Sequence, residues 1–413
     1  MRSALKAAVR HLGRNRRRTV LTGLAVFVPS FILVLFLGVV GGMERDMFAS
    51  LTGYGTGHLQ VRGKAEGLGG ETLPLIRDPE PLLAAVEELE EIASYAVRLD
   101  VPALAVAGDR SLGVLVQGVR PEEAAGSPLA QAVTSGRYLK PGDTGAIVGK
   151  ELLRALGLSL GDEFVLLGAH PQGATGVAVV KVVGVFDIPD PSLGRGLVQV
   201  DLALAQRLVR ADAITAIVIH VKDVSGPWDA WRIEGVAASL RAKLPPGCEV
   251  LDWAELSPES SNYMRLMRPF VWTFSVAFFF LGGLVVLNTL YLSVLERTRE
   301  LGVTLALGAS PRYVMSLVLL EAGLLSLAAA GAGAVAGLGL VWGVEALGGV
   351  RLPGAYREAL ALLGMEPVLR LRVTAVEIAL TALSMVGVAL LSAWYPARKA
   401  ARLEPVEAMR HVT

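Results

Sequence analysis

The sequence has few cysteines, few histidines and little charge for its length. Its 413 residues include a single cysteine, Cys248, which excludes an intrachain disulfide framework and any cysteine-rich zinc or iron–sulfur site. Only 19% of the residues are charged, against about a quarter in a typical soluble protein, and 53% are hydrophobic. The net charge of +1 gives no basic field for a polyanion, so we expect no nucleic-acid partner. These values favour a membrane protein with a sizeable soluble part.

The common signatures of catalysis and metal binding are also missing. The string nearest to a phosphate-binding P-loop, GAIVGKE at 145–151, lacks the first glycine at the right offset and ends in glutamate, not in the hydroxyl that would ligate magnesium. No G-x-S-x-G elbow or H-E-x-x-H helix occurs. His58, His170 and His220 have no pairwise ligand spacing. We therefore predict no catalytic residue, no metal site and no cofactor in this chain.

Four stretches are long and apolar enough to cross about 30 Å of hydrocarbon, which takes roughly 20 helical residues. They lie at 19–42, 269–295, 312–345 and 372–395. The first contains no charge, and it is too long and lacks the small-residue cleavage pattern for a removable signal peptide.

The charges beside the first stretch predict its orientation. Residues 1–18 contain seven basic side chains and no acidic one. The positive-inside rule places such a segment in the cytoplasm. Four spans return the basic tail, 396–413, to the same side. We expect an inner-membrane protein with both termini cytoplasmic, residues 43–268 outside the cytoplasm and a short external loop at 346–371.

The large segment 43–268 has the pattern of a separate domain. A strand–helix–strand order occurs twice, first at 58–63, 79–91 and 92–99, and again at 215–221, 227–244 and 248–253. Two such units predict a split α/β module at about 43–105 and 214–265. The Gly-rich middle, about 106–213, carries short apolar runs and is predicted to be a β-rich insert. The expected fold is four transmembrane helices plus a large extracytoplasmic α/β and β-rich domain.

The segment 296–311, between the second and third spans, has the pattern of a short amphipathic helix. Leu301 and Leu305 share one face, and Arg297 and Glu300 lie on the other. Two interpretations fit this spacing: an interfacial helix that anchors the bundle, or a docking helix for a cytosolic partner.

Several longer motifs carry a resemblance to a known family. The segments Asn288–Ser310 (NTLYLSVLERTRELGVTLALGAS), Leu319–Leu340 and Tyr395–Met409 resemble the FtsX-like permease domain of ABC transporters. The segments Val116–Glu123, Gly136–Phe164 and Val182–Ile188 resemble the MacB-type periplasmic core domain. The motifs occur in the right order and cover nearly the whole chain. TGHLQV at 56–61 looks more like the lipoprotein-releasing, LolC/LolE-like branch.

The resemblance implies a mechanotransmitting permease. Such permeases work as dimers, with themselves or with a related permease, and engage a cytosolic ATPase that binds ATP and Mg. About 18 residues precede the first span, so we expect the ATPase to be a separate chain. Its motion would reach the outside domain through the docking helix and the spans. The expected substrate is a lipoprotein or another amphiphile of the outer leaflet, and a periplasmic or outer-membrane partner is a further expectation.

The same resemblance gives candidate site residues. The predicted residues of the ATPase-coupling helix are Glu296, Arg297, Arg299, Glu300, Leu301 and Leu305, of which the four charged side chains are expected to contact the ATPase. Glu321, two to three turns into the third span, is either the partner of a docking-helix arginine, which we favour, or a snorkelling side chain without a role. Gly333 and Gly337 form a small-residue face suited to close helix packing.

Three other functions stay open on the sequence. The first is export of a drug, peptide or toxin with an outer-membrane partner. The second is a non-transporting regulator of cell-wall hydrolases, against which the size of the outside domain argues. The third is a membrane-anchored scaffold without an ATPase, against which the docking-helix signature argues.

Overall fold

The structure is a computed structural model that describes residues 16–63, 74–124, 127–169, 175–245, 247–354, 356–357, 360 and 365–402. The chain divides into two compact units. Unit 1 comprises Met1–Met43, Arg265–Val350 and Leu369–Thr413, and unit 2 comprises Glu44–Met264 and Arg351–Val368. We describe each unit by itself.

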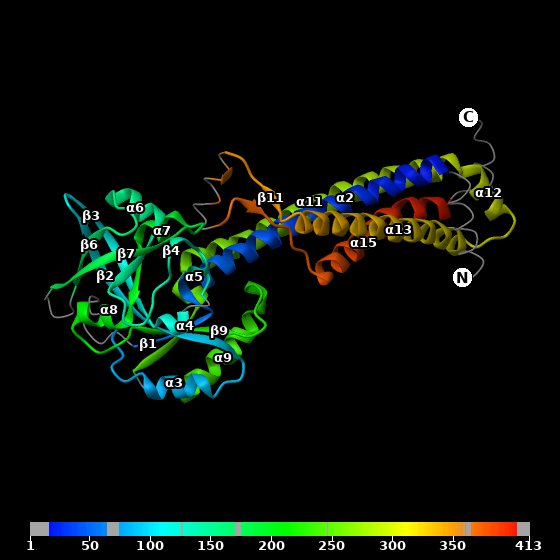
Figure 1. Ribbon diagram of the computed structural model, residues 1–413. Coiled ribbons are helices and arrows are strands. Elements are labelled where there is room, and N and C mark those ends of the chain that lie inside the picture. Colours follow the sequence, from blue (N-terminus) through cyan, green and yellow to red (C-terminus); the bar gives the residue numbers. More distant parts are fainter. Residues whose placement is uncertain are drawn as a thin grey trace. The chain divides into compact units, whose positions relative to one another are not determined.

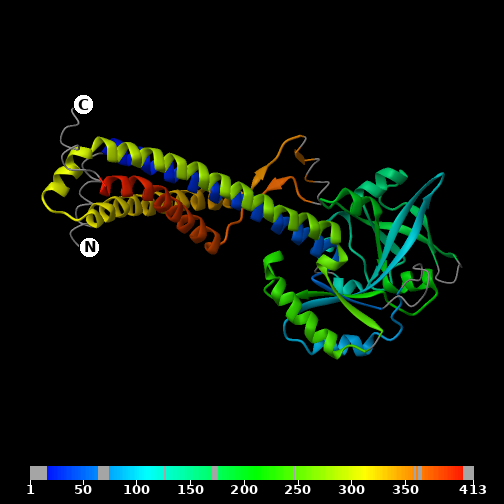
Figure 2. The same cartoon turned by 180° about the vertical axis from the view of Figure 1, so that it is seen from behind.

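Unit 1 is built from long apolar helices. These are α2 (Arg16–Leu51), α11 (Pro258–Glu296), α13 (Pro311–Ala346) and α15 (Ala375–Ala401), of which α2 and α11 continue past the unit boundary. All four are long and apolar enough to cross a membrane, which confirms the predicted helical part of the fold. The short helix α12 (Thr298–Ala306) joins α11 to α13. Figures 1 and 2 show the start of α2 and the end of α15 at the same end of this bundle as α12.

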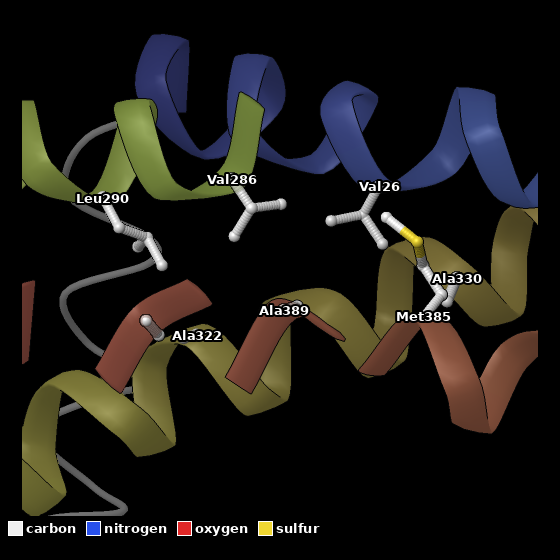
Figure 3. Close-up of a cluster of buried hydrophobic side chains, with 8 residues drawn as sticks. Val26, Val286, Leu290, Ala322, Ala330, Met385 and Ala389 are labelled. Atoms are coloured by element: carbon white, nitrogen blue, oxygen red, sulfur yellow. The ribbon is translucent and has the colours of Figure 1, made fainter. Parts of the chain in front are cut away.

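The core of unit 1 consists of small and medium-sized side chains. Val26 of α2 and Val286 and Leu290 of α11 point towards Met385 and Ala389 of α15 (Figure 3). The same cluster includes three further alanines: Ala322, Ala330 and Ala393. Because lipid is as apolar as leucine, membrane helices gain little from burying large apolar side chains and instead gain from close packing.

The first part of unit 2 is the split α/β module that the sequence predicts. Its strands and helices follow the order β1 (Leu59–Gly63), α3 (Glu80–Glu87), β2 (Ile92–Ala107), β9 (Ala216–Val221), α9 (Ala230–Lys243) and β10 (Cys248–Asp252). The strands pair in the antiparallel order β10-β1-β9-β2. This order is the one that two interleaved strand–helix–strand units produce. The helices α3 and α9 contact each other and lie together in Figure 1.

The second part of unit 2 is a closed ring of strands. The strands β3 (Arg110–Val119), β5 (Gly145–Gly149), β6 (Glu163–Ala169), β7 (Thr175–Phe186) and β8 (Leu197–Asp201) complete the ring with β2, in the order β2-β3-β8-β5-β7-β6 and back to β2. The strand β4 (Val133–Gly136) pairs with β7 outside this ring. The predicted insert is therefore β-rich, but it is not separate from the α/β module, because the two share β2.

Strand β2 passes from one part to the other at Arg98. Its residues up to Arg98 pair with β9, and its residues from Arg98 to Ala107 pair with β3. Arg98 itself lies opposite both Ala216 and Val119. Burial alternates along two strands of the ring: Phe164 and Leu166 of β6 are fully buried with Val165 between them less so, and Val177 and Val179 of β7 are exposed on either side of Ala178. This alternation is the period-2 pattern of a one-face-buried sheet.

Short elements connect these strands. They are η1 (Thr52–Thr56), α4 (Pro121–Ala124), α5 (Pro128–Gln131), α6 (Lys150–Leu156), α7 (Pro191–Gly196), α8 (Leu202–Val209), η2 (Pro227–Asp229) and α10 (Trp253–Leu256), and β11 (Val350–Arg351) pairs with β12 (Val368–Leu369). The chain turns from η1 into β1 at Gly57, which has φ of 66°. A side chain there would collide with Val218 and Ile219, so glycine is required at this turn.

Candidate functional site

The helix α12 has clear start and stop signals. It begins after Arg297 and ends at Ala306, and Gly308 follows with φ of 91°. Ser310 then caps α13 by accepting a hydrogen bond from the Tyr313 backbone N–H at 3.2 Å, with Pro311 at the first helical position. These are the signals that end one helix and start the next within a few residues. The short helix that the sequence predicts at this place is confirmed.

The apolar face of α12 is packed inside unit 1. Leu301 is only 5% exposed and lies in a cluster with residues of α11, α13 and α15, and Leu305 packs against it. The other buried members of this cluster, which we call the hinge core, are Val294, Val314, Val318, Ala397 and Ala400. Leu301 and Leu305, the two apolar members of the predicted coupling helix, therefore form the face of α12 that packs on the bundle.

An ion pair also holds α12. The Arg297 Nη1 atom lies 3.1 Å from Oε2 of Glu321 on α13, and its Nε lies 3.2 Å from Oε2 of Glu300. The Arg297 and Glu321 side chains are only 12% and 14% exposed. The pairing of Glu321 with a docking-helix arginine, which the sequence favours, is therefore present. Because two charges that are mostly covered are costly unless they are paired, this contact fixes the start of α12 on α13.

The outer face of α12 combines charge with apolar surface. Arg299, Glu300, Val303 and Leu307 are exposed, and Leu307 is 84% exposed. Glu296, just before the helix, is exposed as well. Val303 and Leu307 are not among the residues predicted for this helix. Their signal was available, because Arg299, Val303 and Leu307 are four residues apart and so share one helix face.

The glycines of α13 make the close approach that their spacing predicts. A Cβ atom at Gly333 would lie 2.5 Å from the Phe27 carbonyl oxygen, and one at Gly337 would lie 2.9 Å from Val34. Both contacts are with α2. The two backbones can approach this closely only because these positions carry no side chain.

Unit 2 brings together side chains that the sequence does not connect. The His58 ring lies 5.1 Å from the His220 ring, centroid to centroid, and 5.6 Å from Phe48. The His58 Nδ1 atom accepts a hydrogen bond from the Val221 backbone N–H at 2.9 Å. Burial, with a smaller contribution from the neighbouring His220, lowers the pKa of His58 to about 4, so the imidazole is neutral at pH 7.

Within the part of the chain that the structure describes, no group of three or more metal-binding side chains occurs. His170, the third histidine considered from the sequence, lies outside the described residues.

A cavity of about 490 Å³ adjoins the histidine pair. Its walls come from the end of α2, η1, β2 and β9, and from Gln117 and Gln199 on β3 and β8. A chain of hydrogen bonds runs along one wall: Tyr138 donates to Gln199 at 2.8 Å, Gln199 donates to Gln117 at 3.1 Å, and Gln117 donates to Asp100 at 3.2 Å. Nothing in the sequence motifs indicates this polar chain, because its members lie on four separate segments.

Two family models match this arrangement of helices and domain. The model of the MacB-like periplasmic core domain matches residues 19–230, which is over half of the chain. The model of the FtsX-like permease C-terminal region matches residues 272–405. The chain belongs to the family of FtsX-like, MacB-type ABC transporter permeases. With its four candidate spans, the permease is a multi-pass membrane protein.

Relatives of the permease have names from two branches of the family. The lipoprotein-releasing system transmembrane protein LolC of Xylella fastidiosa is 24% identical over 394 residues, which cover 92% of this chain and 90% of that protein. The macrolide export ATP-binding/permease protein MacB of Shewanella sp. (strain ANA-3) is 25% identical over 432 residues, covering 98% of this chain and 60% of that protein. A crystal structure of the periplasmic region of MacB from Actinobacillus actinomycetemcomitans aligns with 50% of this chain and 94% of its own, at 12% identity and a TM-score of 0.33.

Proposed function

We propose that this permease is the membrane subunit of a mechanotransmitting ABC transporter, and that α12 is the helix on which a cytosolic ATPase acts. The observation that carries the proposal is the two-sided structure of α12. Its inner face is fixed by the hinge core and by the Arg297–Glu321 pair, whose atoms lie 3.1 Å apart. Its outer face presents Arg299, Val303 and Leu307 to the surroundings. A helix held in this way moves the spans when a partner moves it.

The partner is proposed to be a separate ATPase chain that binds ATP and Mg. The length match with LolC, at 90% of that protein, supports a subunit of the same kind. A second permease, either a copy of this chain or a relative, would complete a pair of membrane subunits around two ATPases. Because α2 and α11 are unbroken helices that continue into unit 2, they are the proposed path of the motion.

The proposed orientation puts both termini and α12 in the cytoplasm and unit 2 outside it, at the inner membrane. The basic residues 1–18 support this orientation by the positive-inside rule. The position of α12 at the same end of the bundle as the start of α2 and the end of α15 agrees with it (Figure 1).

The proposed substrate is a lipoprotein or another amphiphile that unit 2 takes from the outer leaflet, without passage through the bundle. The relative named lipoprotein-releasing, which matches this chain along most of both lengths, favours this class. Export of a small molecule is the second candidate, and the relatives named for macrolide and pyoverdine export favour it.

The test exchanges charges on the outer face of α12. In the double variant Arg299→Glu with Glu300→Arg, we expect the ATPase activity that the permease stimulates in its complex to fall about tenfold or more, since a partner surface matched to the original charges would meet like charges instead. The matched control is Glu151→Arg with Arg154→Glu, which reverses an exposed pair on α6 of unit 2 whose atoms lie 2.9 Å apart.

The two outcomes separate the interpretations. If the α12 variant lowers stimulated ATPase activity and the α6 control does not, α12 couples the two subunits. Equal activity in both variants, in complexes assembled to the same extent, would mean that α12 only anchors the bundle, and the scaffold interpretation would take its place.

The orientation has its own test. Asp109 is exposed in the turn between β2 and β3, so Asp109→Cys in a Cys248→Ser background provides a single accessible thiol. A membrane-impermeant maleimide should label this thiol in intact spheroplasts. Labelling only after lysis would place unit 2 in the cytoplasm and overturn the orientation.

A further inference from the structure

The cavity of unit 2 has the size of a small-molecule site. Its volume of about 490 Å³ lies within the roughly 300–1,000 Å³ of typical ligand pockets. All of its lining residues belong to unit 2. It lies where β2 passes from the α/β module to the ring, next to Arg98.

Arg98 gives this cavity a positive charge that is incompletely compensated. One Nη atom donates to the Gly55 carbonyl oxygen, while the Nε atom is buried and has no hydrogen-bond partner among the described residues. Burial is the main influence on Arg98 and lowers its pKa, against the weaker opposite effect of Asp100. Because a guanidinium stays protonated in proteins, its burial is costly unless charges and hydrogen bonds offset it, and the contacts of Arg98 offset this cost only in part.

Among the described residues of the cavity wall, the one acidic side chain and the two histidines do not neutralise Arg98. Glu123 uses one carboxylate oxygen to pair with Arg120 at 3.0 Å and the other to accept from the Val97 backbone N–H at 2.9 Å. The histidines are neutral at pH 7, since burial lowers the pKa of both His58 and His220. The wall also contains a second cation, Arg45, so an anion in the cavity would meet positive charge from Arg98 and Arg45.

The rest of the wall suits an organic molecule rather than a bare ion. The amide groups of Gln117 and Gln199 each have a second N–H beyond the one that they use in the hydrogen-bond chain. Phe48, Val119 and Leu129 line the cavity with apolar surface. A planar guanidinium with amide donors beside it fits a carboxylate or a phosphate ester, and the apolar wall fits a short hydrocarbon body.

We propose that this cavity binds a small organic anion, with its carboxylate or phosphate on Arg98 and its apolar body against Phe48 and Leu129. The site goes beyond the proposed transport function, because it needs neither the ATPase nor a second permease. The arrangement assigns Arg98 as the counter-ion and the two glutamines as neutral donors.

The experiment titrates the purified full chain, in non-ionic detergent, with probes that share one eight-carbon tail. Octanoate and octyl phosphate test the two head groups, octanol and octylamine test the tail alone, and inorganic phosphate tests the bare anion. Calorimetry measures the affinity, with empty detergent micelles as the blank. We expect saturable binding of octanoate or octyl phosphate, and binding at least about tenfold weaker for octanol, octylamine and inorganic phosphate.

Variants of Arg98 then test whether this residue binds the anionic head group. Arg98→Gln should weaken binding of the anionic probe by about 10- to 100-fold, because a charge-assisted hydrogen bond is lost. Arg154→Gln, on the exposed surface of α6, should leave the affinity unchanged. Arg98→Met should also lose binding while its melting temperature without ligand stays equal to the parent or rises, since an incompletely compensated buried charge is removed.

Three results would overturn the proposal. The first is octylamine binding as tightly as octanoate, which would mean partition of the tail alone. The second is unchanged affinity in Arg98→Gln. The third is a lower melting temperature in Arg98→Met together with intact anion binding, which would make Arg98 a structural residue. The comparison among probes on the parent chain decides the matter even where a variant does not fold.

Discussion

The two units of this permease are stabilised by opposite kinds of side chain. The core cluster of unit 1 contains four alanines, two valines, one leucine and one methionine, with glycines where α13 crosses α2. The core of unit 2 contains Phe164, Phe186 and several fully buried leucines and isoleucines, and it also encloses the Tyr138–Gln199–Gln117–Asp100 hydrogen-bond chain.

The difference follows from the surroundings that each unit is built for. In water, burying a large apolar side chain contributes about 1.5–3 kcal/mol, so unit 2 gains most from large residues. Between helices in lipid that gain is small, and contact distance matters more, so unit 1 gains most from small residues. The same kind of substitution should therefore have opposite effects in the two units.

The largest effect is expected from a truncation in unit 2. Leu166→Ala removes a fully buried side chain from the ring, so the free energy of unfolding should fall by about 2–5 kcal/mol. Val177→Ala, at an exposed position of the adjacent strand β7, should change it by less than about 0.5 kcal/mol. Chemical denaturation monitored by circular dichroism measures both. Equal losses would show that the ring is not a packed core.

The next largest effect is a dependence of the stability of unit 2 on pH, through His58. The pKa of His58 falls from 6.5 to about 4 on folding, so the unfolded chain binds a proton at a higher pH than the folded one. The stability that neutral His58 contributes is complete above pH 6.5 and is lost as the pH falls from 6.5 towards 4, by about 3 kcal/mol in total. Thermal unfolding between pH 7 and pH 4 measures this slope.

A single substitution separates the contribution of His58 to this pH dependence from that of other groups. In His58→Asn the side-chain oxygen can still accept the hydrogen bond from the Val221 backbone N–H, but the group no longer titrates. The slope between pH 6.5 and pH 4 should therefore flatten, leaving the smaller contribution of His220. An unchanged slope would show that other groups govern the acid sensitivity of unit 2.

The smallest expected effect is on the stability of unit 1, where alanine substitutions at two glycines of α13 should change the stability in opposite directions. Gly333→Ala forces α13 away from α2, since the new Cβ would lie 2.5 Å from the Phe27 carbonyl oxygen, and should destabilise unit 1 by about 1–3 kcal/mol. In Gly331→Ala the new Cβ atom would have no neighbouring atom within 4 Å, so the substitution should stabilise the helix by about 0.5–1 kcal/mol. Melting temperatures in the same detergent compare them, and a loss at both positions would contradict the proposed close contact.

Elements with local signals could be predicted from the sequence. The spans followed from unbroken apolar runs, α12 from its stop at Gly308 and the cap at Ser310, and the split α/β module from a strand–helix–strand order that occurs twice. Each of these depends on residues within a few turns of one another. The pairing of Glu321 with Arg297 was also accessible, because a charge within a span needs a partner.

Features that depend on distant pairings could not be predicted. The ring closes through the pairing of β2 with β6, and the cavity gathers Phe48, Arg98 and His220 from separate segments. The packing partners of Leu301 come from three other helices, and its amphipathic spacing alone could not identify them. Strand register and side-chain clusters of this kind depend on tertiary packing, which periodicity does not encode.

The shared strand β2 also determines how unit 2 comes apart. The strand β2 is the edge strand of the four-stranded α/β module and also one strand of the ring. If β2 detaches from the module, we expect it to detach from the ring as well. The amides on both sides of Arg98 should accordingly exchange with deuterium through a single opening event. The α/β module and the ring are then expected to unfold as one cooperative unit. Excision of residues 106–213, which contain most of the ring, would leave the second half of β2 as an unpaired, aggregation-prone edge.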